Sequence, residues 1–235
     1  MKTISKYSPL TQEERLDLLK NQLKNCWIDF VENGEFPKAI RAKKVDPNLY
    51  ALYMYETYHY TYHNARNQAL VGVRAKGVNP NYVKFCFEHA EEETGHELMA
   101  LHDVRSMGYD VSENNIKAPL PQTEVLVAYL YWISAFGNPL QRLGYSFWAE
   151  SVYEHIDSLL GKIKSDLNLQ NSQMTFFVAH SSIDEDHAAE VQKVMLANLK
   201  TEKDWEDVEQ VMLTSLDLTF KVTDAVLEEF DTLQK

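Results

Sequence analysis

The pattern of apolar and polar positions predicts long helices along most of the chain. Apolar residues recur at the three- and four-residue intervals of a helix, and no segment keeps the strict alternation of a half-buried strand. Clusters of glycine, proline and asparagine interrupt this pattern only at long intervals. The pattern predicts two longer loops at residues 35–48 and 109–122, and seven helices at about residues 12–33, 49–74, 81–108, 123–136, 140–167, 172–199 and 202–235.

Two of these helices begin with a recognisable capping signal. Thr11 is followed three residues later by Glu14, and Thr201 by Asp204, which is the spacing of a capping box. With seven mostly long helices and no internal repeat, the sequence predicts an all-α fold. We expect one compact seven-helix bundle that forms a single domain over residues 1–235.

Composition agrees with one helical domain and narrows the choice of partner. The chain has 235 residues with 45% hydrophobic content, enough for one sizeable core, and only 8 glycines and 7 prolines. Its net charge of −12 argues against nucleic acid or an anionic membrane surface as a partner. From the charge we therefore expect neither nucleic acid nor a membrane as a partner.

The ends and the cysteines indicate a cytoplasmic protein. The first twenty residues show no apolar segment typical of a secretory signal, and no apolar run is long enough to span a bilayer. The two cysteines, Cys26 and Cys86, are far apart and form no CxxC motif, so we expect free thiols without a disulfide or a thiolate zinc site.

The histidines provide the first chemical signal. All eight lie inside predicted helices, and none occurs in the first 58 residues. In the segment HSSIDEDH, His180, Asp184 and His187 stand at positions i, i+4 and i+7. Residues at these intervals share one face of a helix, so the three side chains can converge.

A second group lies in the segment EHAEEETGHE. Glu93 and His96 form an ExxH motif, with His89 and Glu92 on nearly the same helix face. Asp184 and His187 form the corresponding DxxH. Helical bundles build two-metal carboxylate sites from two such motifs together with single carboxylates of other helices.

Glu150 is the best candidate for such a single carboxylate. It lies in the apolar and aromatic segment LGYSFWAES, where an unpaired buried carboxylate would be costly and a cation would offset the cost. Glu56 is a weaker candidate, at ExxH spacing from His59.

Any one of these pairs can arise by chance in an acidic helix, or lie on a solvated face. Together, the ExxH motif, Glu150 and the HxxxDxxH motif, each inside a different long predicted helix, favour a metal site. Imidazole with carboxylate suits iron or manganese.

These residues resemble the heme-oxygenase-like diiron oxidases and oxygenases, a group that includes CADD-like and UndA-like proteins within the superfamily of heme oxygenase, TenA and PqqC. The resemblance covers the second to the sixth predicted helix well and the ends of the chain in outline. It implies two Fe(II) ions, with manganese as an alternative, dioxygen as co-substrate, and oxidation of a small organic molecule. Carried over residue by residue, the implied metal ligands are Glu93, His96, Glu150, His180, Asp184 and His187.

The first carboxylate of the implied site is open to more than one assignment. Some members place it seven residues before the histidine, where this chain has His89. Glu93 is preferred, while Glu92 and Glu56 remain open, as does replacement by His89. Eight aromatic residues are candidates for the lining of the pocket: Tyr55, Tyr58, Tyr62, Tyr129, Trp132, Phe136, Phe147 and Trp148.

Related families differ from this chain at informative positions. Heme oxygenase ligates heme through a histidine of its first helix, and this chain has none before His59, so we expect no heme. TenA thiaminases use a cysteine that residues 128–151 lack. Two further functions stay possible: a metal-independent TenA-like enzyme or small-molecule-binding protein that uses Glu56, and a catalytically silent helical protein that binds another protein. A homodimer is the ordinary assembly for such a bundle.

Overall fold

The computed structural model describes residues 5–112 and 115–235, and it describes residues 181–186 by their helical backbone without their side chains. All regular structure in this part of the chain is helical, which confirms the predicted all-α fold. The number of helices was wrong, because the described residues form eleven α-helices and one 3₁₀ turn (η1) instead of seven helices. They are α1 (Gln12–Asn33), α2 (Glu35–Ala42), α3 (Pro47–Thr61), α4 (Asn64–Arg74), α5 (Pro80–Glu92), α6 (Glu97–Ser106), α7 (Pro121–Ala135), α8 (Leu143–Ala149), α9 (Tyr153–Leu167), η1 (Asn171–Gln173), α10 (Thr175–Asn198) and α11 (Glu202–Leu233).

Both predicted capping boxes are present. The Thr11 hydroxyl accepts from the Glu14 amide while the Glu14 side chain accepts from the Thr11 amide, and Thr201 and Asp204 make the same pair of hydrogen bonds. Each box satisfies backbone donors that a helix start leaves without partners. One predicted loop was wrong, because residues 35–42 form α2, which buries Phe36, Pro37 and Ile40.

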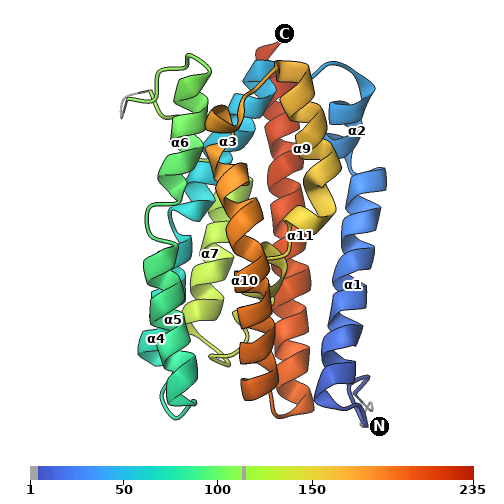
Figure 1. Cartoon of the computed structure of the whole chain (residues 1–235), viewed down its shortest axis with the longest axis vertical. Helices are drawn as coiled ribbons and strands as arrows, with labels where there is room; N and C mark the ends of the chain where they lie inside the picture. Colours follow the sequence, from blue (N-terminus) through green and yellow to red (C-terminus); the bar gives the residue numbers. More distant parts are fainter. Residues whose placement is uncertain (1–4, 113–114) are drawn as a thin grey trace.

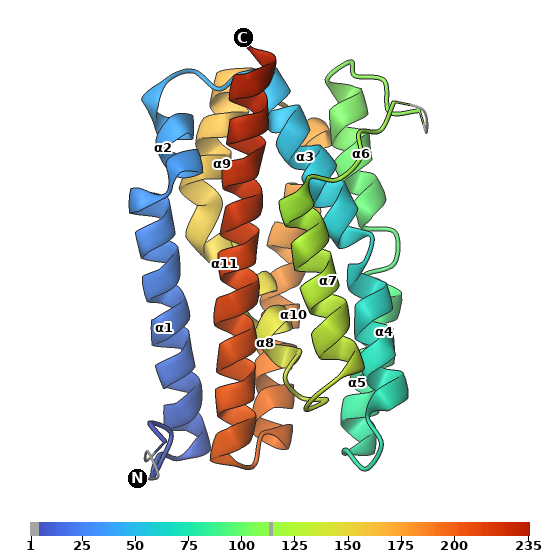
Figure 2. The same cartoon turned by 180° about the vertical axis from the view of Figure 1, so that it is seen from behind.

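The helices form an elongated bundle around α11, the longest helix, which runs from one end of the molecule to the other (Figure 1). Three pairs of helices lie nearly end to end along the bundle: α3 with α4, α5 with α6, and α8 with α9 (Figure 2). The buried apolar side chains form two clusters. We call them the lower core and the upper core, after their places in Figure 1. The lower core includes Leu23, Phe85 and Met212, and the upper core includes Tyr50, Val104 and Ile163.

These three pairs correspond to three helices that the sequence predicts as continuous. The breaks fall at residues 62–63, 93–96 and 150–152. Gly95 has φ +97°, a left-handed conformation that glycine adopts without strain, and this explains one break. The other two contain neither glycine nor proline.

Side chains satisfy backbone carbonyls at or beside each break. The Thr94 hydroxyl donates to Ala90 O at 2.8 Å, the Ser151 hydroxyl to Phe147 O at 3.0 Å, and the Asn67 amide to His63 O at 2.8 Å. Such bonds compete with the helical ladder and lower the cost of interrupting it. The breaks place irregular backbone where the lower core meets the upper core.

Among the described residues, no helix is both long enough and apolar enough to cross a membrane. Cys26 and Cys86 are free, as the sequence predicts.

Candidate metal centre

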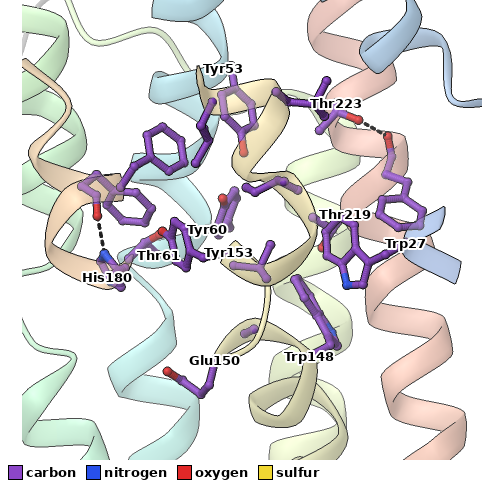
Figure 3. A pocket seen from close by; sticks show the side chains of 18 of the residues that line it. Trp27, Tyr53, Tyr60, Thr61, Trp148, Glu150, Tyr153, His180, Thr219 and Thr223 are labelled. Carbon is purple, nitrogen blue, oxygen red and sulfur yellow. Dashed lines mark hydrogen bonds between the residues drawn. The ribbon is translucent and has the colours of Figure 1, made fainter. Parts of the chain in front are cut away.

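The breaks between stacked helices carry the side chains that the sequence singles out. Glu93 ends α5 and His96 precedes α6, so the ExxH motif lies in a turn and not on a continuous helix face. Glu150 ends α8 at the next break. His180 faces the break segments from the unbroken helix α10, and it lies with Glu150 on the wall of a cavity (Figure 3).

Glu93, His96 and His180 form a first group of potential ligands. Each offers one ligand atom, and these atoms lie within 4.8 Å of one another. His96 Nδ1 is 3.4 Å from Glu93 Oε1, and the rings of His96 and His180 meet edge to face with centroids 4.8 Å apart.

His89, Glu93 and Glu150 form a second group that meets the same 4.8 Å criterion. His89 Nε2 lies 3.1 Å from Glu150 Oε1, and His187 Nδ1 lies 3.4 Å from Glu150 Oε2. Glu93 belongs to both groups. Since a carboxylate has two oxygens, this residue could bridge two cations held side by side.

Within the described part of the chain, four buried ring nitrogens of this cluster make no well-aligned hydrogen bond: both nitrogens of His89, Nδ1 of His96 and Nδ1 of His187. Buried polar atoms without partners are rare in folded proteins, because each loses its bonds to water. Their concentration around two buried carboxylates fits a site that holds cations.

His180 is held in one tautomer. Its Nδ1 donates to Phe176 O at 2.6 Å, as Figure 3 shows, because a carbonyl oxygen can only accept. In the neutral ring, Nε2 then keeps its lone pair and is free to bind a metal ion. A histidine that binds a metal through one ring nitrogen usually donates a hydrogen bond of this kind from the other ring nitrogen.

The protonation states of His89, His180 and Glu93 suit metal binding. Burial lowers the pKa of His89 to about 4 and lowers the pKa of His180, so both rings are neutral near pH 7. Burial opposes the ionisation of Glu93, but His96 and the other nearby rings more than offset it and hold the pKa of Glu93 at about 2. Neutral imidazoles and an ionised carboxylate are the protonation states that ligate a metal.

The surroundings of Glu150 oppose the ionisation of its carboxyl group. Burial raises the pKa of this carboxyl group, and its contact with His187 raises the pKa of that ring to about 9. A proton on His187 thus faces the Glu150 carboxyl group, and a bound cation would replace this positive charge.

A chain of hydrogen bonds fixes Glu93. Its Oε2 accepts from Asn64 Nδ2 at 2.8 Å, and Asn64 Oδ1 accepts from Arg142 Nη2 at 2.6 Å. Arg142 is buried, and it also donates to Asn67, Gln68 and Ser146. Sequence patterns did not reveal this arrangement, because an arginine in an apolar segment has no recognisable metal-site spacing.

We expect Asn64→Leu to weaken iron binding roughly 10–100-fold, because it removes the donor that orients Glu93. The measurement is anaerobic titration with Fe(II). The matched control is Asn67→Leu, which also removes an amide bound to Arg142 but leaves the contact between Asn64 and Glu93 in place. Equal losses in both variants would show that Asn64 acts through the general packing around Arg142.

Five of the six predicted ligand residues lie together in the structure: Glu93, His96, Glu150, His180 and His187. The side chain of the sixth, Asp184, lies outside the described part. His89, left open as a replacement for the first carboxylate, lies beside Glu93 in the second group. That these residues ligate a metal stays a prediction.

Glu56 and Glu92, which the sequence also allows as the first carboxylate, lie apart from the two groups. Glu56 is buried, and its Oε2 accepts from the Leu120 amide at 3.0 Å at the start of α7. It thereby caps a helix. Glu92 Oε2 is 3.5 Å from His187 Nε2, on a side chain that is half exposed.

A cavity of about 120 Å³ opens beside the cluster (Figure 3). Glu93, Glu150 and His180 belong to its wall, and most of the remaining wall is aromatic or aliphatic. Of the eight aromatic residues predicted to line a pocket, the cavity wall includes only Trp148, and Trp132 and Phe136 are about 60% exposed. The rings present come mainly from other helices: Trp27, Phe30, Phe36, Tyr53, Tyr60, Tyr145, Tyr153, Phe176, Phe177 and Phe220.

Comparison with known proteins gives a family and a fold. Residues 51–219 match the model of a family described as iron-containing redox enzymes. A solved domain of unknown function with a heme oxygenase-like fold, from Shewanella denitrificans, is 47% identical, with 97% of each chain covered and a TM-score of 0.91. No curated protein is similar to the chain.

More distant structures share the fold. A TenA homologue from Pyrococcus furiosus is 14% identical over 90% of this chain and 99% of its own, with a TM-score of 0.69. A TenA homologue from Pseudomonas syringae is 11% identical over 96% of this chain and 99% of its own, with a TM-score of 0.72. The bundle thus has the heme oxygenase-like fold that the sequence predicts.

Proposed function

This chain belongs to the family of iron-containing redox enzymes, and from that premise we propose that it is a diiron oxidase or oxygenase that uses dioxygen to oxidise a small organic molecule. The observation that carries the proposal is the pair of ligand groups that share Glu93 on the wall of an apolar cavity. Helical bundles use such groups of carboxylates and histidines to bind two metal ions.

The candidate ligand residues would divide between two ions. Glu93, His96 and His180 would hold one, and His89, Glu93 and Glu150 the other, with His187 next to Glu150. Asp184, as predicted from its spacing, would add a further carboxylate. At these residues a bound iron would supply the electrons for the reduction of dioxygen, with manganese as the alternative metal.

The protein contributes a cavity with a mainly apolar wall next to the proposed metal centre. Trp148, Tyr153 and Phe176 lie on the cavity wall next to Glu150 and His180, so a bound molecule would meet the centre without intervening bulk water. Asn64 and the Phe176 carbonyl hold two ligands in fixed orientations before any metal binds. The proposal includes a small molecule as partner, a cytoplasmic location and no heme.

The test is anaerobic loading of the purified full chain with Fe(II), followed by metal analysis and exposure to dioxygen. We expect about two irons per chain and consumption of dioxygen by the loaded protein. Loading with Mn(II) shows which metal the site prefers. A chain that stays metal-free under anaerobic ferrous loading would contradict the proposal, whereas metal-free protein from aerobic growth would not.

A metal-independent function receives less support. It depends on Glu56 as an acid in the pocket, and in the described structure Glu56 caps α7 and is not among the residues of the cavity wall. The TenA homologues share the fold at low identity, and this likeness carries no information about the chemistry of this chain.

A further inference from the structure

Asp103 of α6 is fully buried and belongs to neither of the two ligand groups that the described residues form. Its Oδ1 accepts from the Thr175 amide and from the Thr175 hydroxyl, each at 2.7 Å, and its Oδ2 accepts from the Phe176 amide at 3.0 Å. Thr175 and Phe176 are the first two residues of α10, whose amides have no acceptor within that helix. Asp103 therefore caps the start of α10 from a different helix.

The residue that Asp103 holds also holds a proposed ligand. Phe176 donates its amide to Asp103, and its carbonyl oxygen accepts from His180 Nδ1 at 2.6 Å, one turn further along α10. A hydrogen bond at one ring nitrogen orients an imidazole and decides which nitrogen is left for a metal. Asp103, Phe176 and His180 thus form one connected series from a buried carboxylate to a ligand ring.

The same carboxylate ties α10 to α6 close to a second proposed ligand. His96 lies directly before α6, and Asp103 follows it by seven residues, which is about two helical turns. The rings of His96 and His180 meet with their centroids 4.8 Å apart. The two helices are therefore joined at two levels, by hydrogen bonds at Asp103 and by the contact between the two rings.

Two other polar contacts between α6 and the segment around the start of α10 are longer. His102 Nε2 lies 3.1 Å from Ser172 O, and Gln173 Nε2 donates to Ser106 O at 3.2 Å. His102 is exposed and Gln173 is half-buried, so water can replace their partners. The Asp103 carboxylate is fully buried, and its loss would leave donors of α10 unpaired, which costs more than an exchange with water.

We propose that Asp103 is a positioning residue of the metal centre, which fixes the register of α6 against α10 and thereby holds His180 opposite His96. Asp103 acts through the backbone of Phe176 and binds no metal itself. The inference rests on the proposed function, because His96 and His180 are ligands only if the chain binds iron.

The test compares Asp103→Asn with Asp204→Asn. Asp204 is a matched control, because its Oδ2 accepts from the amides of Lys200 and Thr201 and from the Thr201 hydroxyl at the start of α11. Its Oδ1 accepts from Asn138 Nδ2. Each aspartate thus uses both oxygens as acceptors, whereas asparagine offers one, so each variant loses a bond and should unfold at a lower urea concentration.

We expect Asp103→Asn to weaken the binding of one of the two irons roughly 10–100-fold, as changes to residues that support a ligand do. The iron affected should be that of Glu93, His96 and His180. Asp204→Asn should leave the binding of both irons unchanged, since α11 starts away from the ligand groups. The measurement is anaerobic titration of the full chain with Fe(II).

A second measurement needs no metal. The His180 ring is followed by NMR of the metal-free full chain with isotope-labelled histidine, and His180→Gln identifies its signal. The Nδ1 proton should exchange slowly with solvent in the natural chain, because it is bonded to Phe176 O in a buried place. It should exchange at least about tenfold faster in Asp103→Asn, because the first turn of α10 then opens more easily, and at the natural rate in Asp204→Asn.

Unchanged iron binding in Asp103→Asn, an equal loss in Asp204→Asn, or a loss without any change at His180 would each overturn the proposal. The failure of the proposed function gives a different result. In that case the natural chain takes up no iron, and the exchange rate still shows whether Asp103 holds His180.

Discussion

Replacing Glu150 with leucine is expected to reduce iron binding from about two ions per chain to at most one. Glu150 is a member of the second ligand group and lies 3.4 Å from His187, so its loss removes the carboxylate from one side of the centre. Changes to residues that only support a ligand already cost roughly 10–100-fold in affinity, and loss of the ligand should exceed about 100-fold. Iron per chain and the rate of dioxygen consumption are the measurements.

Leucine is the appropriate replacement because it has similar volume and suits the apolar surroundings of Glu150, so the metal-free variant should keep its helical circular dichroism. Glu209→Leu is the control. Glu209 is also buried, but it accepts from Tyr7 OH at 3.0 Å and pairs with Lys6. Normal iron content in Glu150→Leu, or an equal loss in Glu209→Leu, would refute the assignment of Glu150.

Gly144→Ala is expected to destabilise the fold by about 3 kcal/mol or more, at the upper end of the cost of overpacking. Gly144 lies where α8 crosses α11. A Cβ atom there would overlap the carbonyl oxygen of Val208 and lie 2.8 Å from the Met212 nitrogen. Both are backbone atoms of a long helix, so neither can rotate away. Urea unfolding followed by circular dichroism measures the change.

The companion variant is Gly161→Ala on α9. A Cβ atom at this position meets nothing within 4 Å, and alanine is the better helix former by up to about 1 kcal/mol. This variant should therefore be slightly more stable than the natural protein. Equal destabilisation by both changes would mean that the contact between α8 and α11 is looser than the structure indicates.

Local signals were enough to predict the unbroken helices. α1 and α11 begin at capping boxes that can be read directly from the sequence, and α10 begins within three residues of its predicted start. The missed α2 follows directly after α1, and its apolar positions are too few to stand out from a loop.

The same local signals could not predict the helix breaks. Only the break at Gly95 contains a residue that disfavours a helix, and Ser151 and Asn67 reveal their role only once their carbonyl partners are known. Spacing on an assumed straight helix still identified Glu93 and His96, because a turn also brings residues three apart close together. It could not decide the place of His89, which depends on how α5 approaches α8.

An iron ion bound at the breaks 93–96 and 150–152 would also link two tiers of the bundle, the helices around the lower core and those around the upper core. Glu93 and Glu150 end helices of the lower tier, and His96 begins a helix of the upper one. Any ion that they share would tie the tiers together, and by linkage its binding energy would add to the stability of the fold. Iron binding would thus raise the free energy of unfolding as well as supply the redox chemistry.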